Sequence, residues 1–179
     1  MRWFWIDRFT EFVSGKTAAA IKCVSQSEEV VDEYAPGRTY LPASVIIEGM
    51  AQTGGLLVGQ MSDFKARIVL AKITSSKFYC EAYPGDILNY RVEIQSQDGI
   101  GTMVNGTSQL NGKPHGEINL MFAALDDERF TNVELFEPSQ FCRMLRLLRL
   151  FEVGVNADGS PIAVPRHMVE AEKAYLSIG

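Results

Sequence analysis

Residues 87–94 show the most regular alternation of apolar and polar side chains in the chain. Alternation with a period of two predicts a half-buried β-strand. Turn signals of the Asp-Gly and Asn-Gly kind follow at 97–99 and 111–112. They bracket a second strand, which we expect at 101–110, and a third strand is expected after them at 116–125. These segments together predict a three-stranded antiparallel meander. The apolar members of the first strand are Leu88, Tyr90, Val92 and Ile94.

The segment from Pro42 to Asp63 is apolar on most sides when it is placed on a helix. Such a helix belongs inside a core and not on a surface. Pro42 or Ser44 can begin it, because proline presets the helical φ and serine can cap a free N–H group. Gly54 and Gly55 each cost about 1 kcal/mol relative to alanine inside a helix. We therefore expect another element to pack closely against them.

The remainder of the N-terminal part predicts shorter elements. Residues 3–12 favour a strand or a turn, and residues 16–25 favour a strand after a Ser-Gly turn. Residues 28–42 lack periodicity and contain prolines, which predicts a loop long enough to carry a function. Two short strands are expected at 67–71 and 77–82. A buried helix followed by a meander predicts the α+β class, with an antiparallel sheet wrapped around the helix.

The pattern changes after Phe130, so we interpret residues 1–130 as one domain and residues 131–179 as a C-terminal extension. Residues 138–151 predict an amphipathic helix, and residues 165–175 a last short helix. Two interpretations of the first helix stay open. It packs on the sheet with a solvated basic face, or that face docks an acidic partner. The basic residues are Arg143, Arg146 and Arg149.

Composition narrows the classes of protein. The chain has 179 residues, of which 46% are hydrophobic, and a formal net charge of −5. The apolar share is enough for a core, while the acidic balance argues against a general nucleic-acid binder. No apolar run is long enough for a membrane span, and no signal peptide is evident, so a cytoplasmic location is expected. Three scattered cysteines and two histidines predict neither a disulfide framework nor a metal site.

Glu48 is the sharpest candidate for chemistry. It is a lone carboxylate in the first turns of a helix that otherwise reads as buried. Burying an unpaired charge is costly, so such a group is protonated, paired, or lines a cavity, and it is a candidate general acid or base. The alternative is a carboxylate that only favours the helix dipole on a half-exposed turn. His115 lies in a predicted turn, where a surface position is expected.

Several motifs in order give the chain a family resemblance. The main one is Ala35-Pro36-Gly37, then Leu41-Pro42-Ala43, then Val45 to Gln52. It resembles the signature of the hotdog-fold 3-hydroxyacyl-acyl-carrier-protein dehydratases of fatty acid synthesis, the FabZ and FabA type. The resemblance covers about residues 3–125. Further matching segments are Trp5 to Arg8, Gly15-Lys16, Lys77-Phe78, Tyr83-Pro84-Gly85-Asp86, Asn111-Gly112-Lys113 and Glu117.

The resemblance implies a hotdog fold, in which a curved antiparallel sheet wraps a long central helix, here followed by a C-terminal helical extension. It also implies a homodimer or a trimer of dimers, with each site shared between two chains. A histidine of one chain and an acid of the other remove water from a 3-hydroxyacyl thioester to give the trans-2-enoyl thioester. No cofactor or metal is implied. The partner is an acyl-carrier protein or a coenzyme A thioester, in fatty-acid or related lipid and polyketide synthesis.

Carried over by position, the family acid falls on Glu48 and the family histidine on Tyr34. The backbone N–H that polarises the thioester carbonyl falls on Ala43, where the family usually has glycine. Tyrosine has an ordinary pKa near 10, so it is a poor base at neutral pH. Three functions therefore stay open: a dehydratase-like hydro-lyase, a catalytically impaired binding relative or partner subunit, and a hotdog thioesterase. The other implied oxyanion or substrate-binding residues are Gly37, Leu41, Pro42 and Gln52.

Overall fold

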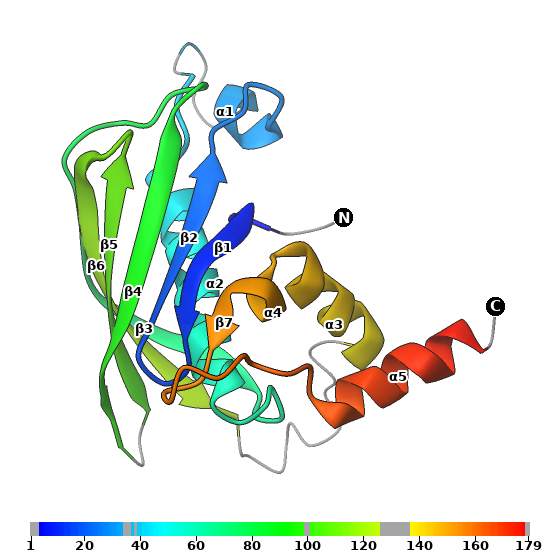
Figure 1. Ribbon diagram of the computed structural model, residues 1–179. Coiled ribbons are helices and arrows are strands. Elements are labelled where there is room, and N and C mark those ends of the chain that lie inside the picture. Colours follow the sequence, from blue (N-terminus) through cyan, green and yellow to red (C-terminus); the bar gives the residue numbers. More distant parts are fainter. Residues whose placement is uncertain (1–3, 34–36, 38, 99–100, 126–136, 178–179) are drawn as a thin grey trace.

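A single curved sheet wraps around one long helix in the computed structural model, which describes residues 4–33, 37, 39–98, 101–125 and 137–177 (Figure 1). The sheet has seven strands in the order β3-β6-β5-β4-β2-β1-β7. The α+β class and the wrapped helix are as predicted. The strands are β1 (Arg8–Val13), β2 (Thr17–Cys23), β3 (Ile68–Phe78), β4 (Ile87–Gln97), β5 (Thr102–Leu110), β6 (Lys113–Ala124) and β7 (Gly154–Val155).

The central helix α2 (Ala43–Gln60) lies within the bounds that the apolar pattern predicts. Its side chains Met50 and Leu57 are fully buried against the concave face of the sheet. The expectation of close packing at the paired glycines is confirmed. A Cβ atom at Gly54 would lie 3.0 Å from the ring of Phe122 on β6. Because glycine has no side chain, the backbone of the helix can approach the sheet closely here.

Strand β4 confirms the alternation from which the meander was predicted. Leu88, Tyr90 and Val92 are buried, whereas Asn89 is half-buried and Arg91 and Glu93 are exposed. The turn after β5 is also confirmed, since Asn111 and Gly112 both have positive φ angles, 50° and 80°. The Asn111 Oδ1 atom accepts a hydrogen bond from the backbone N–H of Ile87 at 2.9 Å, which ties this turn to the start of β4.

The two short strands predicted at 67–71 and 77–82 are wrong, because a single strand, β3, runs from Ile68 to Phe78. The polar residues in the middle of β3 resemble a loop between two strands in the sequence. In the structure they remain in one strand, because they pair with β6. Lys72 faces Met121 in this pairing, and the register shifts on either side. Such bulges let a strand continue while it bends.

The loop predicted at 28–42 contains a short helix, α1 (Glu29–Glu33). Its anchor is Val31, whose side chain is fully buried in the core. A helix of one turn has too few residues for a periodic apolar pattern, so no such pattern predicts it.

The C-terminal part contains α3 (Pro138–Leu147), α4 (Leu150–Val153) and α5 (Arg166–Leu176). The helix predicted over 138–151 is therefore interrupted. Arg149 adopts a left-handed conformation with φ 60°, which turns the chain between α3 and α4. The N-terminus of α3 is capped by Glu137, whose carboxylate accepts the backbone N–H groups of Ser139 and Gln140 at 3.0 and 2.8 Å.

The C-terminal part continues the sheet and the core, a feature that the sequence did not predict. Strand β7 pairs in parallel with β1, and the backbone N–H of Phe9 donates to the Leu148 carbonyl at 2.8 Å. Leu145 and Leu150 are fully buried in the same core cluster as Phe9. The domain boundary at residue 130 stays a prediction.

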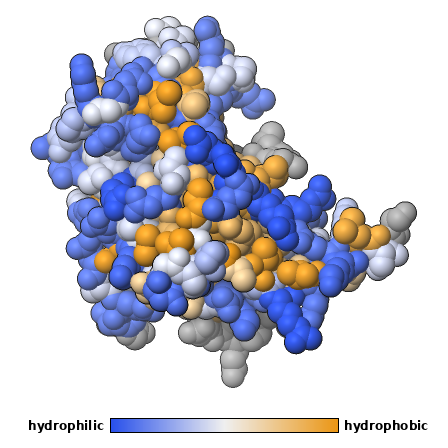
Figure 2. All heavy atoms as spheres, in the orientation of Figure 1, coloured by the Kyte–Doolittle hydropathy of each residue, from blue (hydrophilic) through white to orange (hydrophobic). Residues whose placement is uncertain are grey.

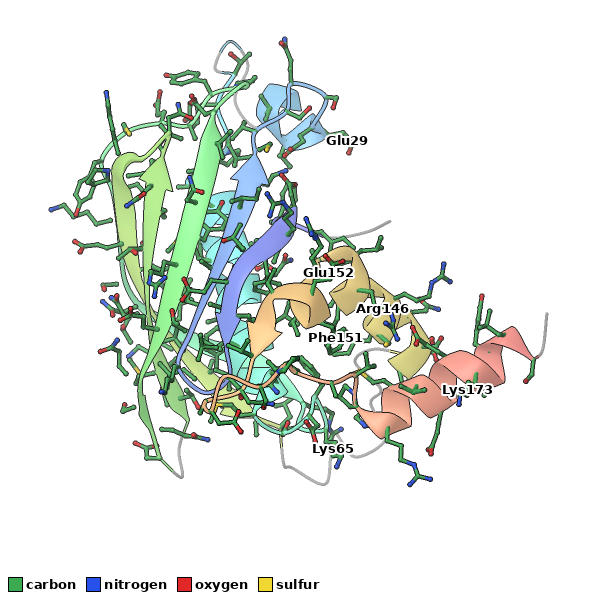
Figure 3. The ribbon with its side chains drawn as sticks, viewed as in Figure 1. Glu29, Lys65, Arg146, Phe151, Glu152 and Lys173 are labelled. Carbon is green, nitrogen blue, oxygen red and sulfur yellow. The ribbon has the colours of Figure 1, made fainter. Side chains whose placement is uncertain are left out.

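Helix α5 extends from the body of the protein and packs against α3 (Figures 1 and 3). Met168 is its buried anchor, and Arg146 of α3 reaches across to Glu172 at 3.0 Å. Apolar side chains gather near the free end of α5 (Figure 2), where Tyr175 and Leu176 are exposed. None of the helices in the described ranges is long and apolar enough to cross a membrane.

Leu150 and Leu147 offer a test of whether the C-terminal part folds together with the rest. Leu150→Ala should lower the free energy of unfolding by about 2–5 kcal/mol, because it opens a cavity in the shared core. Leu147→Ala, at a side chain that is 55% exposed, should change it by at most about 0.5 kcal/mol. The measurement is urea unfolding followed by tryptophan fluorescence, since both tryptophans lie in the first five residues.

A single transition that moves with Leu150→Ala would show one cooperative unit. If the fluorescence transition of Leu150→Ala coincides with that of the unmodified protein, the C-terminal part unfolds on its own and the boundary at residue 130 is supported.

Candidate functional site

Glu48 lies in the second turn of α2, and its side chain is half-buried. Its Oε1 atom accepts a hydrogen bond from Gln52 Nε2 at 3.1 Å. The two residues are four apart on the helix, so their side chains lie on the same face. Among the described residues, no other hydrogen bond to the Glu48 carboxylate is present, which leaves its second oxygen for a substrate.

The orientation of the Gln52 amide is fixed from its other side. The backbone N–H of Trp5 donates to Gln52 Oε1 at 3.0 Å. Because a backbone N–H can only donate, the amide oxygen must face Trp5 and the NH₂ group must face Glu48. The N-terminal segment thus determines which group Glu48 meets. The sequence did not reveal this chain of contacts, because Trp5 acts through its backbone.

Gly49 makes this arrangement sterically feasible. A Cβ atom at this position would lie 2.6 Å from the Trp5 carbonyl oxygen and 2.8 Å from the ring of Tyr90. Only a glycine lets the N-terminal segment lie against the helix at this distance. The glycine beside the candidate acid therefore has a packing role.

The start of α2 is held by a backbone contact and by proline. The N–H of Leu41 donates to the Ala82 carbonyl at 2.8 Å, and Pro42 then begins the helix with φ −59°. Ala43 is exposed in the first turn, where N–H groups have no acceptor within the helix. An N–H group without a helical acceptor is what an oxyanion-binding role requires, and that role of Ala43 stays a prediction. The structure thus places Leu41, Pro42, Ala43 and Glu48 within the first two turns of α2 or directly before it.

The remaining predicted site residues are less fully placed. Gly37 is exposed with φ +80°, a conformation that favours glycine. Tyr34, at the position of the family histidine, lies outside the described residues, and so does Arg38. The role of Tyr34 therefore stays a prediction.

His115 is fully buried, so the expectation of a surface histidine is wrong. It lies in a bulge of β6, with Nδ1 2.8 Å from Ser108 Oγ and its ring 5.4 Å from that of Phe78. The bulge turns an additional side chain inward, which a simple alternation does not predict. Burial lowers the pKa of His115 below its ordinary value. Its contacts lie in the sheet, so the structure does not bring it to Glu48.

A buried polar cluster at the end of β2 was also missed. Lys22 is only 6% exposed, and its Nζ atom lies 2.5 Å from Glu28 Oε1 and 3.7 Å from Asp7 Oδ1. The signal was present in the sequence, because Lys22 shares its side of the strand with Ala18 and Ala20. A charge on the buried face of a strand calls for a partner.

The arginine face of α3 is largely neutralised within the chain. Arg146 pairs with Glu172, and Arg149 pairs with Glu152 at 2.6 Å. Arg143 is exposed. Of the two interpretations of this helix, packing with a solvated basic face is the one that its buried residues support.

No cluster that could hold a metal ion occurs in the part of the chain that the structure describes. The three cysteines are free, and Cys23 and Cys80 are exposed. Burial, and secondarily the neighbouring Glu172, raises the pKa of the Cys142 thiol to about 11, so it is not a thiolate at neutral pH.

Comparison with known sequences matches residues 3–115 to the family model of the FabA-like domain. A FabZ 3-hydroxyacyl-[acyl-carrier-protein] dehydratase of Helicobacter pylori is 34% identical over 130 residues, which cover 68% of this chain and 82% of the relative. The FabZ dehydratase of Clostridium acetobutylicum is 29% identical over 118 residues, with 65% of this chain and 84% of the relative covered.

Comparison with solved structures supports the hotdog fold. The dehydratase heterocomplex ApeI:P from Xenorhabdus doucetiae superposes with a TM-score of 0.59 at 17% identity, over 70% of this chain and 85% of that one. A Streptococcus mutans protein bound to acetyl CoA gives a TM-score of 0.53 at 14% identity, over 65% and 86%. At these identities the likeness concerns the fold alone.

Gly49→Ala should reduce stability by about 1–3 kcal/mol, because the added methyl group must displace Trp5 or Tyr90. The matched control is Gly59→Ala on the same helix. A Cβ there meets only an ordinary contact of 3.4 Å, so this change should stabilise the protein by up to about 1 kcal/mol. Thermal unfolding measures both, and equal effects of the two variants would contradict the close approach at Gly49.

The buried imidazole predicts a pH dependence of stability. Because the folded pKa of His115 is lowered, the unfolded chain takes up a proton at higher pH than the folded protein. His115 should therefore reduce stability as the pH falls below about 6.5, with a slope of at most about 1.4 kcal/mol per pH unit. Urea unfolding between pH 7.5 and 5 should show a shallower slope for His115→Gln. Identical slopes would show that His115 does not titrate differently in the two states.

Proposed function

The chain belongs to the FabA-like family, and on that premise we propose that it processes acyl thioesters at the start of α2, with Glu48 as the catalytic acid or base. The observation that carries this proposal is the fixed carboxylate of Glu48, one oxygen of which is held by Gln52 while the other is left for a ligand. The reaction is the removal of water from a 3-hydroxyacyl thioester, as the names of the curated relatives indicate for them.

The chemistry assigns a role to each placed group. Dehydration breaks the C–H bond next to the thioester carbonyl and the C–O bond of the 3-hydroxyl, and forms a C=C bond between these carbons. The N–H of Ala43 would stabilise the negative charge on the carbonyl oxygen while the proton leaves. Glu48 would deliver a proton to the departing hydroxyl, which leaves as water. Leu41 and Pro42 would fix the position of the Ala43 N–H.

This scheme does not yet assign the residue that acts as the base. Tyr34 stands where the family has histidine, and a phenol holds its proton at neutral pH. A second reading is therefore a subunit that supplies Glu48 to a site whose base comes from another chain. One observation favours it: the Xenorhabdus doucetiae structure is a dehydratase heterocomplex.

We also propose that a second copy or a paralogue pairs along β3. Within the described residues this strand pairs only with β6, so its other edge carries backbone groups without a strand partner there. The side chains of Leu70 and Ile73 on β3 are 37% and 41% exposed. Such exposure is expected, in a single chain, of apolar side chains that a partner chain would cover. The assembly of three such dimers stays a prediction.

The expected ligand is a thioester of an acyl-carrier protein or of coenzyme A, and no cofactor is proposed. An acidic carrier would need a basic contact surface, for which the exposed Lys65 and Arg143 are candidates. Three free thiols accord with the reducing cytoplasm as the proposed location.

Purified protein should convert 3-hydroxyacyl thioesters to enoyl thioesters, which an absorbance assay detects. Glu48→Gln should reduce the rate by about 100-fold or more, because the amide cannot exchange a proton. The control Glu152→Gln, on the exposed surface of α4, should leave the rate unchanged. Tyr34→His should raise the rate if the base is the missing element.

The other readings give different results in the same experiment. Turnover only after co-expression with a histidine-containing paralogue indicates the partner subunit, and release of free thiol indicates a thioesterase. An absence of turnover together with an absence of thioester binding would contradict the proposal.

A further inference from the structure

Lys22 points into the concave side of the sheet, where the neighbouring inward positions are alanines. Its side chain is 8% exposed, and the Glu28 carboxylate that it contacts is 18% exposed. An ion pair removed from water to this degree is maintained only with close geometry, and loss of one partner leaves a buried charge. Here the two charged atoms are 2.5 Å apart.

Glu28 begins the segment that leads into α1. Its Oε1 atom also accepts the backbone N–H of Ser25 at 3.3 Å, and its backbone carbonyl accepts the N–H of Val31 at 2.9 Å. The same segment is fixed at its start, where the N–H of Val24 donates to the Asp86 carbonyl at 2.9 Å. The Ser25 and Val31 bonds are internal to residues 24–33. Of the contacts named, the Val24 bond and the Lys22 ion pair join this segment to the rest of the protein, and the ion pair is the one that carries charge.

Asp7 joins this ion pair to the candidate acid. Its carboxylate lies 3.7 Å from Lys22 Nζ and accepts the backbone N–H of Cys23 at 2.7 Å. Two residues earlier, Trp5 makes the contact with Gln52 that orients the amide toward Glu48. One short stretch of chain therefore meets Lys22 at one end and the Glu48 pair at the other.

We propose that Lys22 is a positioning residue: it clamps residues 24–33 through Glu28 and the N-terminal segment through Asp7, and so holds in place the segment whose Trp5 backbone orients Gln52 toward Glu48. Its effect on turnover rests on the proposed function, whereas the clamp itself does not. Lys22 touches no reacting atom in this arrangement.

The charges in this region make the clamp sensitive to the loss of Lys22. Without it, the carboxylates of Asp7 and Glu28 remain close together with no cation between them. Tyr90 does not replace the cation, because its hydroxyl is neutral and has no hydrogen-bond partner among the described residues. Burial, then the charges of Asp7 and Glu28, raise its pKa. Opening of residues 24–33 toward water is the simplest way for Glu28 to regain hydration.

The test is hydrogen–deuterium exchange of the full chain, resolved by segment. Lys22→Met should increase amide exchange in residues 24–33 by about 100-fold while α2 and β4 keep their protection. Glu170→Gln is the matched control, since it breaks an ion pair with Arg166 whose side chains are 60% and 92% exposed. It should leave exchange in residues 24–33 unchanged.

A double variant keeps the test decisive if the single variant folds poorly. Lys22→Met combined with Glu28→Met replaces the pair by apolar side chains, and exchange in residues 24–33 should return to within about threefold of the unmodified protein. Unchanged exchange in Lys22→Met would overturn the clamp. A uniform increase across α2 and β4 would also overturn it, because Lys22 would then serve stability in general.

Turnover separates the clamp from the proposed function. With an active protein, Lys22→Met should lower kcat/KM at least about tenfold, mainly through kcat, and Glu170→Gln should not. If the unmodified protein neither turns over nor binds a thioester, the proposed function fails, and the exchange result still decides the clamp.

Discussion

The close contact between α2 and the sheet that wraps it is the constraint on which the rest of the structure depends. Three glycines make it feasible: Gly49 faces Trp5 and Tyr90, Gly54 faces Phe122, and Gly106 of β5 faces Met50. At each of them a Cβ atom would lie within about 3 Å of a neighbouring atom. Interiors are packed like crystals, so a helix at this distance has one position and one rotation about its axis. The direction in which Glu48 projects is set by that rotation.

The functional elements are arranged around the first half of this helix. The Leu41 contact with Ala82 fixes where the helix begins, and the Trp5 contact with Gln52 fixes what meets the acid. The Lys22 ion pair includes Asp7, two residues after Trp5. The Trp5–Gln52 and Gln52–Glu48 contacts are partly buried, so each is electrostatically stronger than it would be in full contact with water. The site thus depends on backbone contacts from segments far apart in the sequence.

Much of this architecture could be predicted from the sequence, for physical reasons that differ between elements. The alternation in β4 and the apolar content of α2 report burial directly, and the Asn111-Gly112 turn requires positive φ angles. Glu48 could be singled out because a lone charge in an apolar helix is costly. By contrast, β3 carries polar residues through its middle because its pairing with β6 compensates for them, and β7 has only two residues. The burial of His115 depends on a bulge, which shifts the inward positions by one. These features arise from tertiary contacts that local patterns do not contain.

The two lateral edges of the sheet differ in a way that bears on how many copies can associate. On the β1 side the last strand is β7, whose two residues are followed by a bridge from Val155 to Pro161, a residue that lacks a backbone donor. This edge of the sheet presents few backbone groups with which another strand could pair. The opposite edge, formed by β3, is long and continuous. In the proposed dimer, growth by strand addition would therefore be self-limiting, because two chains joined along β3 would form a sheet that ends in β7 on both sides. The two residues of β7, in the C-terminal part, would then close the sheet against further copies.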